Sequence, residues 1–155
     1  MSKPIIGIVG RENISKIERE VIHVEDNYRK AVIKFGGIPL AILPIQDISY
    51  SVSDKKSILE MAENEKQNLI QILKICDGII VPGGHRIFEY DKFICKYAID
   101  NNIPLLGVCL GMQTMASIDC FEERIIEPIN NGINHKVEEK FAHKVNVNKD
   151  SFLYS

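Results

Sequence analysis

Residues 103–115 read IPLLGVCLGMQTM, and this stretch decides how the rest of the chain is interpreted. An apolar run leads into the turn GVCLG at residues 107–111, and a segment with helical character follows. The nucleophile elbow G-x-S-x-G has the same order, in which a strand is followed by a nucleophilic side chain and then by a helix. The flanking glycines are expected to permit a sharp turn, with Cys109 in an unfavourable backbone region. Taken alone, the turn also fits a cysteine that is only a small core residue.

Such a turn has chemical consequences for Cys109. Its sulfur is expected beyond the carboxyl end of a parallel sheet, which is where ligands bind in α/β folds. The N-terminus of the following helix favours the thiolate over the thiol. The backbone N–H of Leu110 is then expected to bind a developing oxyanion.

Strands and helices are expected to alternate on both sides of this turn. Short apolar runs rich in β-branched residues predict buried strands at 5–9, 38–44, within 77–84, and at 103–108. Helical spacing of apolar residues predicts helices at 24–35, 58–75, 90–101 and 112–118. Residues 143–147 alternate in polarity and are expected to form a further strand. This order predicts a single α/β domain over residues 1–155, doubly wound, with a largely parallel sheet and flanking helices.

Composition excludes several classes of function. The 155 residues are 45% hydrophobic and 26% charged, and 19 Lys and Arg against 21 Asp and Glu give a net charge of −2. Neither a nucleic-acid partner nor a membrane span or signal peptide is expected. The four cysteines form no C-x-x-C pair and have no zinc spacing, so neither a metal nor another cofactor is expected. Reduced thiols in the cytoplasm are the expected setting.

The longer string around Cys109 points to a family. Residues 104–115, PLLGVCLGMQTM, resemble the active-site signature of class I glutamine amidotransferases. The whole chain also resembles the gamma-glutamyl-gamma-aminobutyrate hydrolase branch of the peptidase C26 type, notably at 4–8, 36–39, 77–84, 143–145 and 151–154. The resemblance implies a flavodoxin-like, class I glutamine amidotransferase-like domain.

The same resemblance implies roles for individual residues. Cys109 would attack a γ-carboxamide or γ-glutamyl amide and carry a γ-glutamyl thioester, which water or an acceptor resolves. Gly84 would supply a second oxyanion N–H beside that of Leu110. Gly83 and Gln113 would lie near the substrate. His85 is expected to reach the pocket because it directly follows the Gly83–Gly84 turn, although the hydrolase branch usually carries other residues at this point.

The base and its orienting carboxylate are the parts that the sequence lacks. In the family they form a His-x-Glu element late in the domain, which is not found here. His23-Val24-Glu25 matches by letters but precedes a helix, so it is interpreted as a coincidence. His143 is interpreted as structural and His135 as a surface residue. The domain is therefore expected to be incomplete at its C-terminal end, and its activity impaired.

Three functions remain open from the sequence. The first is a hydrolase of small-molecule γ-glutamyl amides, and the second is a glutaminase component that hands ammonia to a synthetase partner. The third is a non-catalytic, truncated homologue whose cysteine senses oxidants. The partner expected besides the substrate is a second copy of the chain or a missing C-terminal piece.

Overall fold

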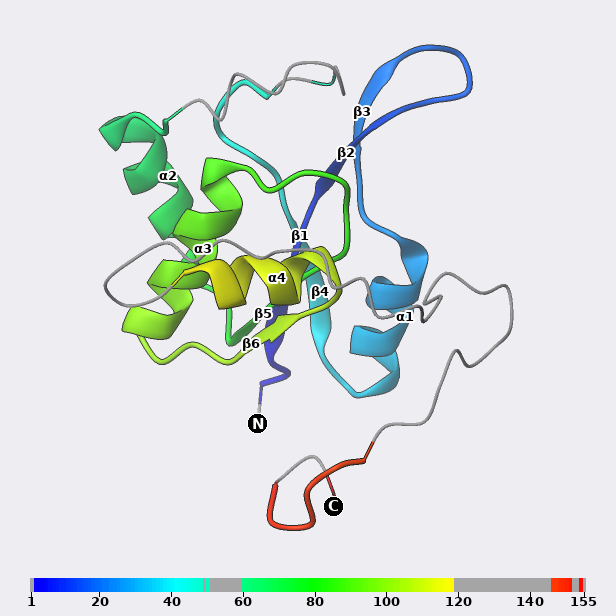
Figure 1. Ribbon diagram of the computed structural model, residues 1–155, viewed down its shortest axis with the longest axis vertical. Helices are drawn as coiled ribbons and strands as arrows, with labels where there is room; N and C mark the ends of the chain where they lie inside the picture. Colours follow the sequence, from blue (N-terminus) through cyan, green and yellow to red (C-terminus); the bar gives the residue numbers. More distant parts are fainter. Residues whose placement is uncertain (1, 49, 51–59, 119–145, 152–153, 155) are drawn as a thin grey trace, which may run out of the picture.

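A computed structural model describes residues 2–48, 50, 60–118, 146–151 and 154, and its elements alternate much as the sequence predicts (Figure 1). The strands are β1 (Ile5–Val9), β2 (Arg11–Ile14), β3 (Glu20–His23), β4 (Ile38–Ile42), β5 (Gly78–Val81) and β6 (Leu105–Gly107). The helices are α1 (Asp26–Lys34), α2 (Glu63–Leu73), α3 (Glu89–Asp100) and α4 (Leu110–Ser117).

The central sheet has four parallel strands in the order β4-β1-β5-β6. This is the order of the first four strands of a flavodoxin-like sheet. The chain moves from β1 to β4 through α1 and returns across β1 to β5 through α2. Right-handed crossovers in opposite directions place α1 on one face and α2 and α3 on the other. Figure 1 shows α1 apart from the group formed by α2, α3 and α4. The doubly wound α/β fold is thereby confirmed.

The main core lies between the sheet and helices α2 and α3. Val9 and Ile79 from the sheet pack there with Leu69 and Leu73 of α2 and Ile94 of α3, all almost fully buried. The burial explains why β1 and β5 are nearly continuous apolar runs, because a strand covered on both faces has no polar side. The carboxyl ends of β1 and β5 are thus held rigidly next to each other, and the loops that follow them build the site.

Helix α1 ends where the glycine pair predicts. Gly36 has φ of 87°, a conformation that costs glycine little. The N–H of Gly37 donates to Val32 O at 2.9 Å and that of Gly36 to Ile33 O at 3.0 Å. These two bonds form a Schellman motif, which satisfies the last carbonyls of the helix and turns the chain into β4.

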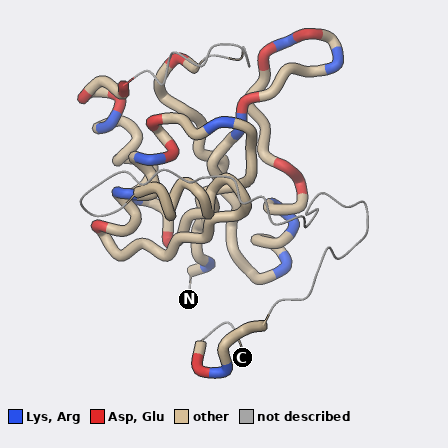
Figure 2. The backbone as a smooth tube through the Cα atoms, viewed as in Figure 1, with Lys and Arg blue, Asp and Glu red and all other residues tan. Residues whose placement is uncertain are grey.

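The β2–β3 hairpin was not predicted, because residues 11–23 show no alternation of apolar and polar residues that would indicate strands. Its strands pair antiparallel from Arg11 opposite His23 to Ile14 opposite Glu20. It projects beyond the end of β1, and Figure 2 shows charges of both signs along it. Its apolar residue Ile14 remains 51% exposed, so the hairpin has no apolar face against the core that would have marked it as strands.

Other boundaries shift by a few residues. Residues 24 and 25 precede α1, and residues 60–62 precede α2 without being helical. Helix α4 begins at Leu110, two residues earlier than predicted. Residues 146 and 147 are not in a strand, and the rest of the predicted strand at 143–147 lies outside the described residues, as do Cys120, His135 and His143. None of the helices that the structure describes combines the length and hydrophobicity needed to cross a lipid bilayer.

Candidate active site

Cys109 occupies the apex of a strained turn between β6 and α4. It is the N-cap of α4, with φ of 52° and ψ of −109°. A residue other than glycine held in such a region stores about 1–3 kcal/mol of strain. The Val108 N–H donates to Val81 O at 3.0 Å, and the Gln113 N–H donates to Cys109 O at 3.0 Å. These bonds hold the turn on both sides while the cysteine itself is exposed.

Cys109 has the unfavourable backbone conformation predicted for it, and the glycines on either side of it lie where a side chain would collide with neighbouring backbone. The positive φ falls on Cys109, whereas neither Gly107 nor Gly111 has a positive φ. A Cβ on Gly111 would overlap the carbonyl oxygen of Val81, and one on Gly107 would lie 2.6 Å from Met112 N. Glycine is therefore needed because α4 packs directly against β5 and β6, and the strain of the turn is left to the cysteine.

The turn after β5 lies against the cysteine turn. A Cβ on Gly83 would lie 3.4 Å from Cys109 Cβ and 3.9 Å from its Sγ. A Cβ on Gly84 would lie 3.2 Å from Leu110 Cδ2. Within the described ranges, the N–H groups of Gly84 and Leu110 donate to no backbone acceptor. Two amide groups without a backbone acceptor thus lie in the two turns next to the exposed thiol.

A buried ion pair supports the turn after β5. Arg11 Nη1 lies 2.6 Å from Asp91 Oδ1, and Arg11 Nη2 donates to Pro82 O at 2.7 Å. The other Asp91 oxygen accepts the Phe88 N–H at 3.0 Å. The two charged side chains are only 5% and 0% exposed. Arg11 therefore ties the hairpin, the start of α3 and the carbonyl just before Gly83 together.

The electrostatics of this pair follow from its burial. Burial alone lowers the pKa of the Arg11 guanidinium, but the Asp91 carboxylate outweighs burial and raises that pKa. A guanidinium remains charged in proteins, and at 2.6 Å it holds Asp91 as its counter-ion. No local sequence pattern indicates this contact, because its partners are 80 positions apart.

The cysteines of the described chain differ sharply in environment. Cys76 and Cys95 are buried, whereas Cys109 is exposed. Burial raises the pKa of Cys95 to about 12 and also raises that of Cys76. Both are therefore protonated, unreactive thiols at neutral pH. Cys95 lies on the buried side of α3, and Cys76 follows the end of α2.

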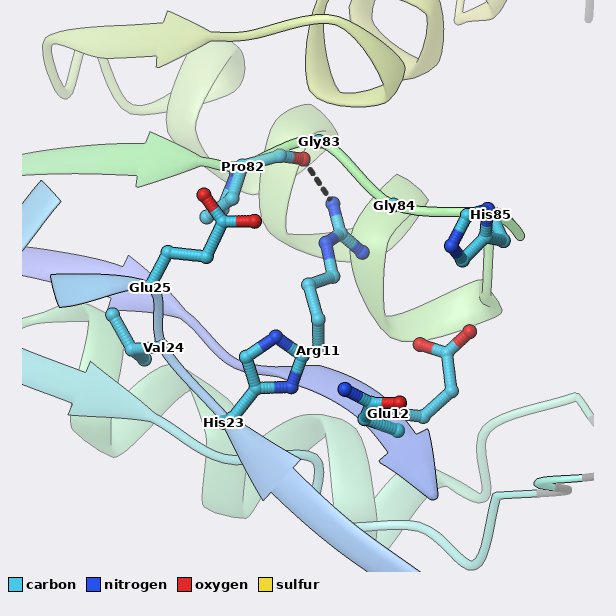
Figure 3. Close-up of a pocket in the computed structure, with 10 residues that line it drawn as sticks. Arg11, Glu12, His23, Val24, Glu25, Pro82, Gly83, Gly84 and His85 are labelled. Atoms are coloured by element: carbon cyan, nitrogen blue, oxygen red, sulfur yellow. Dashed lines mark hydrogen bonds between the residues drawn. The ribbon is translucent and has the colours of Figure 1, made fainter. Parts of the chain in front are cut away.

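A cavity of about 310 Å³ opens beside the Gly83–Gly84 turn (Figure 3). Residues 11–13 of β2, residues 23–25 between β3 and α1, and residues 82–85 after β5 line it. Of the residues expected to bind the substrate, Gly83 and His85 are on its wall, whereas Gln113 is not. Cys109 is also not on the wall, so the two glycines lie between the thiol and this cavity.

His23, Val24 and Glu25, interpreted from the sequence as a chance match to the His-x-Glu element, line the cavity beside Gly83 and Gly84. The reason is the hairpin, which carries the end of β3 back across the carboxyl end of β1. His23 Nδ1 is buried and has no hydrogen-bond partner. In the part of the chain that the structure describes, no cluster of His, Cys, Asp and Glu could hold a metal ion.

Comparisons with known proteins identify a family and several relatives. The family model described as glutamine amidotransferase class-I matches residues 46–154. A CTP synthase of Staphylococcus carnosus is 33% identical over 112 residues, which cover 70% of this chain and 17% of that protein. A putative glutamine amidotransferase-like protein of Rickettsia prowazekii is 25% identical, with 97% of this chain and 55% of that protein covered.

A solved structure is also similar in part. It is described as the glutaminase domain of Trypanosoma brucei CTPS with bound acivicin, at 23% identity and a TM-score of 0.43, with 74% of this chain and 39% of that chain covered. The present chain thus spans about a sixth of the CTP synthase and about half of the Rickettsia protein. Because the family model extends over more than half of the chain, the chain belongs to the class I glutamine amidotransferase family.

Proposed function

We propose that this chain is a cysteine-dependent amidohydrolase that forms a γ-glutamyl thioester on Cys109. The observation that carries the proposal is the exposed thiol at φ of 52°, at the N-terminus of α4 and in contact with the Gly83–Gly84 turn. The substrate is glutamine or a γ-glutamyl amide of a small amine. The γ-glutamyl amide follows from the resemblance to the gamma-glutamyl-gamma-aminobutyrate hydrolase branch.

The chemistry proceeds in two halves. The Cys109 thiolate, favoured by the N–H groups at the start of α4, adds to the amide carbonyl carbon. The N–H groups of Leu110 and Gly84 bind the oxygen as it gains negative charge. The C–N bond then breaks, the nitrogen takes up a proton and the amine leaves. Water adds to the thioester, the C–S bond breaks, and glutamate and the free thiol are released.

Hydrolysis of the thioester is expected to be the slower of the two halves. Proton transfer by a positioned base contributes about 10²–10⁴-fold to such reactions. The two described histidines, His23 and His85, line a cavity whose wall does not include Cys109. We therefore expect Cys109 to be acylated and the acyl-enzyme to turn over slowly.

A glutaminase component that delivers ammonia to a synthetase is the second candidate. The identity of 33% to a CTP synthase favours it. The two candidates differ in what they need. A hydrolase releases the amine unaided, whereas a glutaminase component is silent until its partner is added.

Labelling with a chloroketone analogue of glutamine tests the shared chemistry. The thiolate displaces chloride, so one adduct is expected, and peptide mass spectrometry should find it on Cys109. Cys76 and Cys95 are internal controls, since both are buried. Cys109→Ser should abolish the adduct. Equal labelling of wild type and Cys109→Ser, or labelling that glutamine does not slow, would contradict the proposal.

A further inference from the structure

We propose that the cavity between the β2–β3 hairpin and the turn after β5 receives the amine half of the substrate and favours an amine that carries an ammonium group. The inference rests on the proposed function, which identifies the other half of the substrate as a γ-glutamyl group. It adds the chemical class of the leaving amine, which neither the family nor the signature around Cys109 specifies.

The position of the cavity is the first support. Gly83 lines the cavity and also lies next to Cys109, because a Cβ added at residue 83 would lie 3.9 Å from Cys109 Sγ. Gly84 likewise lies between Leu110 Cδ2 and the Arg11 side chain. A substrate whose carbonyl lies on this turn has its glutamyl part on one side and its amine part on the other. The volume of about 310 Å³ suits a small amine.

The charge of the cavity wall is the second support. Arg11 is neutralised, because Asp91 contacts its guanidinium at 2.6 Å. The carboxylates of Glu12 and Glu25 remain, and within the described part of the chain neither has an ion-pair partner. Figure 3 shows Glu12 on the side of His85 and Glu25 on the side of Pro82, with Arg11 and His23 between them. Two carboxylates in a recess produce a negative potential that attracts a cation.

Unpartnered polar atoms are the third support. Glu12 Oε2, His23 Nδ1 and Arg11 Nε are buried and have no hydrogen-bond partner. Buried polar groups in native proteins are rarely left in that state. An ammonium group donates up to three hydrogen bonds, which matches the free acceptor on Glu12. Arg11 Nε needs an acceptor instead, and an amide oxygen or a water molecule supplies it.

The same features select against a carboxylate-bearing amine. In the γ-glutamyl amide of γ-aminobutyrate, the free end is a carboxylate, which would lie in the recess with Glu12 and Glu25. Like charges brought together in a partly desolvated site are unfavourable. The amide of a diamine of equal length places an ammonium there instead. The wall therefore discriminates between two ligands of similar size by charge alone.

Binding to the Cys109→Ser chain tests the inference without requiring turnover. The probes are three γ-glutamyl amides of similar length, made from diaminobutane, γ-aminobutyrate and butylamine, with affinities measured by titration calorimetry. We expect the diaminobutane amide to bind at least about tenfold more tightly than the γ-aminobutyrate amide, which corresponds to about 1.4 kcal/mol. The neutral butylamide should lie between them, and added salt should reduce the difference.

Variants identify the residues responsible. Glu12→Gln keeps the shape of the side chain and removes its charge, so the preference should fall to within about threefold. Glu25→Gln is a second variant at an exposed position, and it should reduce the preference in the same direction. Glu20→Gln is the matched control, because Glu20 lies on the same hairpin but does not line the cavity. It should leave all three affinities unchanged.

The outcomes separate this inference from the proposed function. Equal affinities for the three amides, or tighter binding of the γ-aminobutyrate amide, would overturn the inference even if Cys109 is acylated. A preference that survives in both glutamine variants would also overturn it. If chloroketone labelling fails while the ammonium preference and its loss in Glu12→Gln are observed, the proposed function fails and the cavity remains a site for a cationic amine.

Discussion

The substitution Arg11→Met tests how strongly the buried ion pair holds the site together. Asp91 has no exposed side-chain surface, and without Arg11 the Phe88 N–H would be the one hydrogen-bond donor left to its side chain among the described residues. Breaking a buried pair by removing one member typically costs about 3–5 kcal/mol, because the remaining charge is neither solvated nor paired. Native domains are stable by only about 5–15 kcal/mol, so this loss is a large fraction of the total.

A second ion pair in the same chain provides the control for Arg11→Met. Arg29 and Asp26 also approach to 2.6 Å, but each side chain is 51% exposed. Since solvated pairs contribute little, Arg29→Met should leave the urea midpoint unchanged. Both variants can be followed by circular dichroism during urea denaturation. The double variant Arg11→Met/Asp91→Asn should recover part of the loss, because both charges are removed. If Arg11→Met and Arg29→Met were equally harmless, burial would not govern the strength of these pairs.

Three further predictions concern the turns and the core around the site. Gly111→Ala should destabilise the chain more than Gly36→Ala in urea denaturation. A Cβ at residue 111 would overlap the β5 carbonyl, whereas a Cβ at residue 36 has no atom within 4 Å and the cost there is backbone strain alone. Iodoacetamide at pH near 8 should alkylate Cys109, while Cys95 stays unmodified until the chain unfolds. Burial raises the pKa of Cys95 to about 12, so its thiol is protonated at the pH of the experiment. Peptide mass spectrometry measures the modification of both cysteines. Tyr90→Phe should cost about 1 kcal/mol in the free energy of unfolding, because it removes a buried hydroxyl that donates to the backbone carbonyl following β1 at 3.1 Å.

The fold could be predicted from sequence to the extent that its signals are local. Continuous apolar runs marked β1 and β5, and the glycine pair at 36 and 37 marked the end of α1. The β2–β3 hairpin gave no such signal, since its residues are mostly polar and exposed. Backbone pairing and the contact of Arg11 with Asp91 hold the hairpin, and neither leaves a periodic pattern in the sequence.

The candidate site was predictable in part for the same reason. The string around Cys109 is contiguous, so it was recognised, and the neighbouring Gly83–Gly84 turn follows a recognisable strand. Arg11 was not identified, because its importance comes from a contact with Asp91 across 80 positions. The strained backbone expected at Cys109 is confirmed, whereas the packing of Gly111 against the β5 carbonyl was not predicted, because close packing of a helix against a strand leaves no separate signal in the sequence.

The strained backbone at Cys109 lowers the stability of the chain at the residue that carries the reactive sulfur. Glycine adopts φ of 52° readily, so Cys109→Gly should raise the free energy of unfolding in urea denaturation by about 1 kcal/mol. The same substitution removes the sulfur atom. A screen that selects only for thermal or chemical stability would therefore select against the nucleophile at this position. Stabilising substitutions should leave residue 109 unaltered and be placed in the exposed hairpin.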